Sequence, residues 1–154
     1  MKLKLIALSF ILLSSILSTA QTTRWQQAMS CEMDIDMDVE THRFTGTQKL
    51  VYTNNSPDDL DQVFYYLFFN AFQPGSMMDV RSRTIEDPDS RVGDRISQLD
   101  ESQQGFQNIT SLKMDGVNVD FNVEGTILEV NLPKTLKSGK KATFEMVFDA
   151  QVPI

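Results

Sequence analysis

The sequence predicts an all-β fold, and three observations carry this prediction. Segments in which apolar and polar residues alternate recur along the 154 residues, which is typical of half-buried strands. Turn-forming pairs such as Asp115–Gly116 separate these segments, as they do in hairpins. No apolar pattern of helical period extends over a long stretch. We expect seven or eight strands in an antiparallel β-sandwich, or a saddle-like curved sheet packed on a smaller one.

The first twenty residues predict a secretory signal peptide. An apolar stretch from Leu5 to Leu17 follows two basic residues, Lys2 and Lys4, and precedes the small residue Ala20, after which we place the cleavage. A transmembrane anchor is the alternative, but serines interrupt the stretch and no basic stop-transfer group follows it. We therefore expect export to the periplasm or the extracellular space, no membrane attachment after cleavage, and a β domain over residues 21–154.

Composition excludes several classes of function. The formal net charge of −7 becomes −9 when Lys2 and Lys4 leave with the signal, which disfavours binding to nucleic acid or to anionic lipid. Cys31 is the only cysteine, so no internal disulfide can form. His42 is the only histidine, so a zinc site with two histidines cannot be assembled. We expect no catalytic residue, no metal and no cofactor within this chain.

The segment 31–40 alternates without error and predicts a half-buried strand, paired in a hairpin with residues 43–53. Gly46 in the second strand predicts a bulge or a close backbone approach. A calcium site is the alternative role for the acids, but alternate carboxylates on a strand lie about 7 Å apart and do not converge. We expect the side chains of Cys31, Met33, Ile35, Met37 and Val39 to point inward, and those of Glu32, Asp34, Asp36, Asp38 and Glu40 to form a solvated acidic face.

The middle of the chain combines an aromatic run with a long excursion. Residues 63–69 are apolar on both faces, which predicts a central strand covered on two sides. A short buried helix is the alternative, which the density of aromatic residues disfavours. Residues 73–108 show no clean period and predict one long loop that is functional, packed on another domain or disordered. Within it, Ile96 and Leu99 allow a short helix.

The strand signals return after this loop. Asp115–Gly116 and Glu124–Gly125 predict two tight turns. The side chains of residues 126–132, which follow the second turn, alternate between two sides as in a strand. Residues 133–141 predict a turn segment. The last strand is predicted to place one apolar face on the core, with Phe144, Met146 and Phe148.

The order of these segments also matches a known pattern, a hairpin of the form strand, F-x-G, strand, then a turn and L-x-x-V-x-x-x-L-x-x-N-A-F. The matching residues are Phe44, Gly46, Leu60, Val63, Leu67, Asn70, Ala71 and Phe72. In this order the chain resembles the N-terminal β domain of the aminopeptidase N type (gluzincin) zinc metallopeptidases, over nearly all of residues 21–154. The loop of residues 73–108 resembles that of a secreted, Bacteroidetes-like subgroup.

The resemblance implies a role without catalysis. In the family, H-E-x-x-H and a downstream Glu hold the zinc in a separate catalytic domain, and this sequence contains no H-E-x-x-H. The chain ends in mid-pattern for the family, which predicts a fragment or a truncated product. The resemblance therefore implies a scaffold and cleft-wall domain that is inactive alone. Its partner is the catalytic domain of the full-length protein, which carries the zinc and meets the peptide substrate.

The long loop is the segment expected to reach that partner. We predict interdomain or cleft contacts at Met77, Met78, Arg81 and Arg83, because methionines adapt to apolar surfaces and arginines pair with carboxylates. A solvated loop with internal ion pairs is the alternative. For the whole chain the alternative function is a free-standing secreted β-sandwich module that binds peptide or glycan. An enzyme in its own right is a third alternative.

Overall fold

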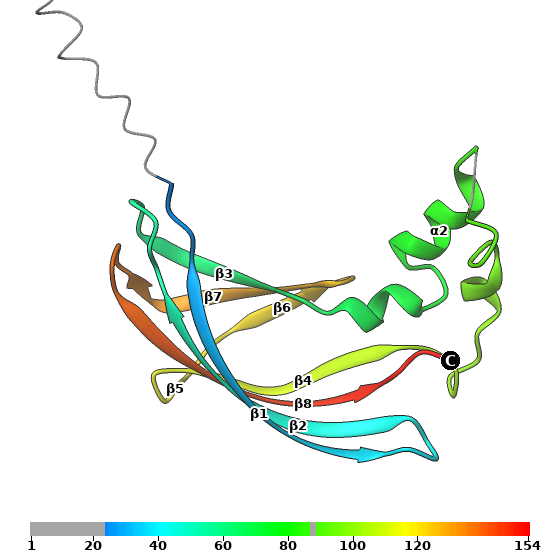
Figure 1. The fold of residues 1–154 in the computed structure, drawn as a ribbon, viewed down its shortest axis with the longest axis horizontal. Helices are drawn as coiled ribbons and strands as arrows, with labels where there is room; N and C mark the ends of the chain where they lie inside the picture. Colours follow the sequence, from blue (N-terminus) through cyan, green and yellow to red (C-terminus); the bar gives the residue numbers. More distant parts are fainter. Residues whose placement is uncertain (1–23, 87–88) are drawn as a thin grey trace, which may run out of the picture.

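The computed structural model describes residues 24–86 and 89–154, and most of these lie in two antiparallel sheets (Figure 1). The predicted signal peptide at 1–20 lies outside the described residues and stays a prediction. The elements, with η for 3₁₀ helices, are β1 (Ala28–Asp38), β2 (Arg43–Thr53), β3 (Leu60–Tyr66), η1 (Phe68–Phe72), α2 (Met77–Thr84), η2 (Arg95–Gln98), β4 (Phe106–Met114), β5 (Val117–Asn118), β6 (Phe121–Glu124), β7 (Ile127–Leu136) and β8 (Lys141–Gln151).

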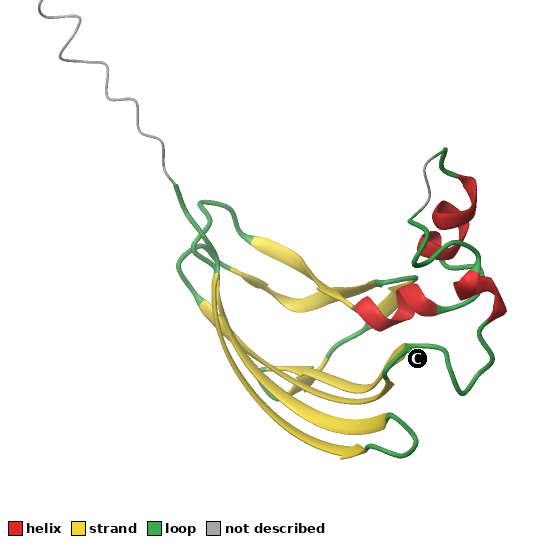
Figure 2. Ribbon diagram, turned by 45° about the vertical axis from the view of Figure 1, so that its right-hand side comes forward, coloured by secondary structure: helices red, strands yellow, loops and turns green. Residues whose placement is uncertain are grey.

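The two sheets differ in size and curvature. The larger sheet has the strand order β1-β2-β8-β4-β5, and the smaller sheet has the order β3-β7-β6. The larger sheet curves beneath the smaller one, while the helical segment lies at one end of both (Figures 1 and 2). The predicted all-β sandwich with a curved sheet is confirmed.

Local turn chemistry fixes the hairpins that the sequence predicts. Asp115 and Gly116 have φ values of 50° and 82° between β4 and β5, as a two-residue hairpin turn requires. Gly125 has a φ of 57° between β6 and β7. β1 and β2 pair in unbroken register from Ala28 opposite Thr53 to Asp38 opposite Arg43. These three hairpins are confirmed. The predicted turn at residues 133–141 is shorter, because β7 continues to Leu136.

The core lies between β8 of the larger sheet and β7 of the smaller one. Phe144 on β8 is 1% exposed, and Leu128 and Val130 on β7 are fully buried. The Tyr65 ring meets the Phe144 ring edge to face, with 6.3 Å between the centroids, and so joins β3 to the larger sheet. The inward face predicted for Phe144, Met146 and Phe148 is confirmed.

Gly46 marks a close approach. A Cβ atom built there would lie 2.6 Å from Cζ of Phe148, well inside van der Waals contact. The register of β2 with β1 and with β8 shows no shift at this position. The predicted bulge is therefore wrong, and the close approach is made by the Phe148 ring and not by another backbone.

β1 is the first strand whose predicted burial is wrong. All its residues from Ala28 to Asp38 are exposed, including Cys31, which we expected to point inward. The alternation does place the apolar residues on the core side of the sheet. However, β1 is the edge strand, and the smaller sheet does not extend far enough to cover it.

The aromatic run is the second correction. β3 is an edge strand of the smaller sheet and not a central strand, and the chain leaves it after Tyr66 to form η1. The inner face of β3 packs on the core through Val63 and Tyr65. The outer face has no covering layer among the described residues, so its aromatic side chains are exposed.

The segment predicted as one long loop contains two helices, α2 and η2, and this is the third correction to the expected fold. Ser76 caps α2, because its hydroxyl oxygen accepts a hydrogen bond of 3.1 Å from the Asp79 N–H. η2 contains Ile96, as the alternative allowed. Among the residues that the structure describes, no helix has the length and apolar character needed to cross a membrane.

Candidate interaction surface

The four predicted contact residues all lie on α2. Met77 is 87% exposed and Met78 is half-buried, while Arg81 and Arg83 are exposed. Met77 and Arg81 are four residues apart, so they share one face of the helix. α2 also contacts η1, and the Ser76 hydroxyl donates a hydrogen bond of 2.6 Å to the Ala71 carbonyl. The structure therefore gathers the predicted residues on one short, anchored helix.

An ion pair between the buried Asp79 and the partly exposed Arg83 orients this helix. Asp79 is fully buried, and its carboxylate accepts hydrogen bonds from Nε of Arg83 at 2.9 Å, from Nη2 of Arg83 at 3.0 Å and from the Gly75 N–H at 2.8 Å. The Arg83 guanidinium, assisted by the Gly75 N–H, holds the pKa of Asp79 below its usual value. Arg83 is thus engaged within its own helix by a bidentate pair.

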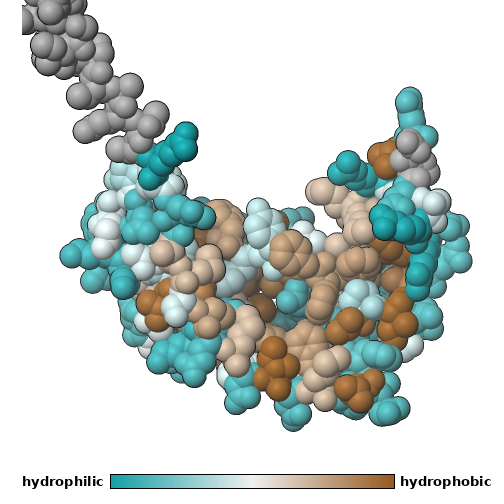
Figure 3. Space-filling model, in the orientation of Figure 1, coloured by the Kyte–Doolittle hydropathy of each residue, from teal (hydrophilic) through white to brown (hydrophobic). Residues whose placement is uncertain are grey.

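An exposed aromatic patch lies on β3 and η1, and η1 contacts α2. We define this aromatic patch as Phe64, Tyr66 and Phe68, which are 58%, 64% and 69% exposed. The rings of Tyr66 and Phe68 stack at 5.6 Å between centroids with 15° between their planes. Figure 3 shows that apolar side chains also gather around a hollow between the strands and the helical segment. Large exposed apolar patches on soluble proteins mark interaction sites.

The sequence does not reveal the aromatic patch, because the pattern of residues 63–69 predicts a core strand covered on two sides. The run carries large side chains of both parities, with Val63 and Tyr65 on one face and Phe64 and Tyr66 on the other. This pattern fits a strand covered on both faces as well as an edge strand covered on one, and the structure shows the second.

A second uncovered surface follows β1. We define the β1 apolar row as Met29, Met33, Ile35 and Met37, which are 65%, 52%, 47% and 47% exposed. Met33 lies opposite Gln48 of β2, which lies opposite Met146 of β8, and Met146 is buried. The β1 apolar row therefore continues the core face of the larger sheet beyond the edge of the smaller one.

Tyr65 lies on the inner face of β3, at the open side of the sandwich. Burial raises the pKa of its hydroxyl, and the Cys31 thiol adds a smaller effect in the same direction. Among the described residues, the buried Tyr65 hydroxyl has no hydrogen-bond partner. A phenol with a raised pKa stays protonated near neutral pH, so Tyr65 is not poised to act as a base.

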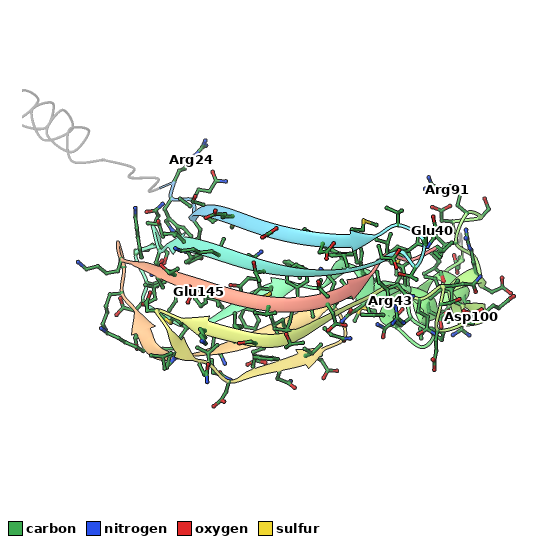
Figure 4. The ribbon with its side chains drawn as sticks, turned by 90° about the horizontal axis from the view of Figure 1, so that it is seen from below. Arg24, Glu40, Arg43, Arg91, Asp100 and Glu145 are labelled. Atoms are coloured by element: carbon green, nitrogen blue, oxygen red, sulfur yellow. The ribbon has the colours of Figure 1, made fainter. Side chains whose placement is uncertain are left out.

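The outer face of the larger sheet carries the carboxylates. Figure 4 shows this face from below, with β1 at its margin and Glu145 on β8. A groove of about 510 Å³ crosses it. Its charges alternate from strand to strand in register, since Glu32 lies opposite Lys49, Lys49 opposite Glu145, and Glu145 opposite Lys113. This balanced ladder is suited to cross-strand stabilisation and does not form a site of single charge.

The described residues do not form a zinc site. Within residues 24–86 and 89–154, no three His, Cys, Asp or Glu side chains come close enough together to hold a metal ion. His42 lies in the β1–β2 turn with a φ of 57°. The donor set of this part of the chain therefore does not fit the zinc that the sequence resemblance implies for a catalytic domain.

Comparison with solved structures identifies the fold. The chain is similar to the crystal structure of the M1 zinc metallopeptidase from Deinococcus radiodurans, with 12% identity, a TM-score of 0.51, and coverage of 83% of this chain and 21% of that one. It is similar to a two-domain M1 zinc metallopeptidase mutant bound to L-tryptophan, with 11% identity, a TM-score of 0.51, and coverage of 85% and 22%. No protein-family model and no curated protein sequence matches the chain.

These likenesses bear on the fold. The chain spans about a fifth of the length of the structures it matches, at an identity that shows shared architecture alone. The resemblance to aminopeptidase N type enzymes is confirmed at the level of fold. The Bacteroidetes-like subgroup stays a prediction.

Proposed function

We propose that this chain is the non-catalytic N-terminal scaffold and cleft-wall domain of a secreted zinc aminopeptidase-like metallopeptidase. The observation that carries the proposal is the fold shared with M1 zinc metallopeptidases over 83% of this chain but only 21% of theirs. In this proposal the zinc and the peptide hydrolysis belong to a separate catalytic domain. This chain supports that domain and hydrolyses nothing alone.

The exposed apolar surface supports a docking role. The aromatic patch and Met77 on α2 leave four large apolar side chains exposed to water, and exposed apolar patches mark interaction sites. We assign the aromatic patch to the contact with the catalytic domain. Met77 and Met78 provide adaptable apolar contacts at the cleft wall, and Arg81 pairs with a carboxylate there. Arg83 orients α2 by pairing with Asp79, and the exposed part of its guanidinium contributes to the same contact.

Export is part of the proposal and rests on residues 1–20. Their basic, apolar and small-residue parts are those of a secretory signal, and the single cysteine leaves no disulfide to be formed after export. The protein would act in the periplasm or outside the cell, free of the membrane once the signal is removed.

The test has two parts, sequencing of the gene and measurement of peptidase activity. Sequencing beyond the codon for Ile154 should reveal an H-E-x-x-H motif in the same reading frame. The complete gene product should hydrolyse aminoacyl-p-nitroanilides. Replacing Phe64, Tyr66 and Phe68 by serine in that product should reduce kcat/KM by about tenfold or more, because misplacement of a cleft wall lowers turnover steeply.

The matched control is Val117→Ser on β5, which is 57% exposed and belongs to the larger sheet, whereas the aromatic patch lies on the smaller sheet and η1. It should leave kcat/KM and the melting temperature unchanged. A reading frame without H-E-x-x-H would overturn the proposal, as would full activity of the triple serine variant. Retention of the purified chain on polysaccharide columns, lost in the same variant, would instead assign the stacked rings to glycan binding.

A further inference from the structure

The outer edge of β1 is a long, open strand edge. Its eleven residues pair with β2 on one side, and no strand of the described chain lies on the other. Alternate N–H and C=O groups on that side therefore point away from the sheet. Such an edge accepts another extended strand through main-chain hydrogen bonds. Figure 4 shows β1 running the full length of the sheet at its margin.

The β1 apolar row gives an added strand something to cover. Ile35 lies opposite Gly46, which lies opposite the buried Phe148, so the row stands at the rim of the core. Between 47% and 65% of each of its four residues is exposed. A strand added beside β1 would place its own apolar side chains next to this row and extend the core face by one position.

The acidic row on the other face decides which strand fits. Glu32, Asp34, Asp36 and Asp38 project from the outer face of β1, and only two of them lie opposite a base, Lys49 and Arg43. If a second copy of β1 were added antiparallel with matching faces, every one of these carboxylates would lie beside another carboxylate, which is destabilising. A register shifted by one residue would move the acids of the added strand to the apolar side. The edge therefore disfavours self-association.

We propose that the free edge of β1 binds an extended peptide segment in which lysine or arginine alternates with apolar residues. Its basic side chains would lie directly opposite the carboxylates of Glu32, Asp34 and Asp36, where opposite charges stabilise cross-strand pairs. Its apolar side chains would cover Met33, Ile35 and Met37. Main-chain hydrogen bonds to β1 supply affinity, and the alternation of charge supplies selectivity.

This inference does not rest on the proposed function. The aromatic patch belongs to the smaller sheet and η1, whereas the acceptor edge belongs to the larger sheet. Variants of one surface leave the other intact. Loss of peptide binding and loss of peptidase activity can therefore be measured separately.

The probe is a synthetic ten-residue peptide in which lysine alternates with valine, capped at both ends. Its binding to the full chain is followed by fluorescence anisotropy at low and moderate salt. A peptide in which glutamate replaces lysine should bind at least tenfold more weakly. Raising the salt concentration should weaken the binding of the lysine peptide and not that of the glutamate peptide, since salt screens exposed ion pairs.

Two N-methylated forms of the lysine peptide report on strand addition. In one form the odd-numbered residues are methylated, and in the other the even-numbered residues are methylated. Only one of these sets can face β1, because successive N–H groups of a strand point to opposite sides. One form should therefore lose binding and the other should retain it.

Charge reversal on β1 locates the site. The variant D34K/D36K should lose at least tenfold in affinity for the lysine peptide and gain affinity for the glutamate peptide. The matched control E86K/E124K changes two exposed carboxylates elsewhere and should behave like the wild type. Equal binding of both N-methylated forms, or of the lysine peptide to D34K/D36K, would overturn the proposal. A dimer of the wild-type chain that D34K/D36K abolishes would assign the edge to a second copy and would also overturn it.

Discussion

Phe144 and Cys31 lie on the same face of the same sheet, two strands apart, yet Phe144 is 1% exposed and Cys31 is exposed. Leu50 of β2 lies between them and is 7% exposed. Burial along this one row is therefore set by how far the smaller sheet reaches. It covers β8 and β2 through residues such as Tyr65 and leaves β1 open.

The comparison separates two properties that alternation combines. The period of two assigns a side chain to a face of a sheet. Cover for that face comes from another layer, which is specified by residues far away in the sequence. The core-facing rows of β2 and β8, on the closed side of the sandwich, satisfy both conditions. The β1 apolar row, on the open side, satisfies only the first. Both interaction surfaces lie where such cover is missing, one on β1 and the other on the outer face of β3.

The largest expected effect on stability comes from a substitution in the core, on the closed side of the sandwich. Phe144→Ala would remove a buried ring and its edge-to-face contact with Tyr65, and should lower the free energy of unfolding by about 3 to 5 kcal/mol. Urea denaturation followed by circular dichroism measures this change. The control is Phe64→Ala on the outer face of β3, which should cost about 0.5 kcal/mol or less. Equal losses in the two variants would contradict the assignment of the core to one side.

The next largest effect is expected from the buried hydrogen-bond network of Asn54. Asn54 is fully buried, and its Nδ2 group donates to the carbonyls of Asp58 and Leu136 at 2.8 and 3.1 Å, while its Oδ1 atom accepts from Ser56. Asn54→Ala leaves these groups unpaired and should cost about 2 to 3 kcal/mol. The neighbouring variant Asn55→Ala, at an exposed position, should cost far less. Similar melting temperatures for the two variants would show that the network contributes little.

A smaller effect tests the contact between β2 and β8. Gly46→Ala would place a methyl group 2.6 Å from Cζ of Phe148 and should destabilise the fold by about 1 to 3 kcal/mol through overpacking. Phe148→Leu costs stability on its own but removes the ring that clashes. A double-mutant cycle should therefore be non-additive, with Gly46→Ala costing less in the Phe148→Leu background. Strict additivity would mean that strand strain, and not the ring, makes the site intolerant.

Much of the fold could be predicted from the residues because its signals are local. The Asp115–Gly116 turn, the alternation in β8 and the restricted position of Gly46 each depend on near neighbours or on one apolar face. α2 was missed because its sequence, MMDVRSRT, is short and mostly polar. Its order comes from the Ser76 cap and the buried Asp79, which no apolar period reveals.

The candidate surfaces could be predicted only in part. Residue type alone indicates Met77, Met78, Arg81 and Arg83 as contact residues, and the structure places all four on α2. The aromatic patch and the apolar face of β1 were both predicted to be buried. Their exposure depends on strand order, since β3 and β1 are edge strands, and no local pattern in the sequence fixes which strand ends a sheet.

The smallest expected effect on stability is that of Met33→Ala on the open side of the sandwich. Met33 and Met146 share one row of the larger sheet, at 52% and 6% exposure, so Met33→Ala should change the free energy of unfolding by about 0.5 kcal/mol or less. Met146→Ala should cost about 2 kcal/mol or more. Repeating both measurements with the lysine–valine peptide at saturation sharpens the comparison. The peptide should stabilise the wild type and should lose part of that stabilisation in Met33→Ala, because a bound strand covers Met33 and leaves Met146 as it was.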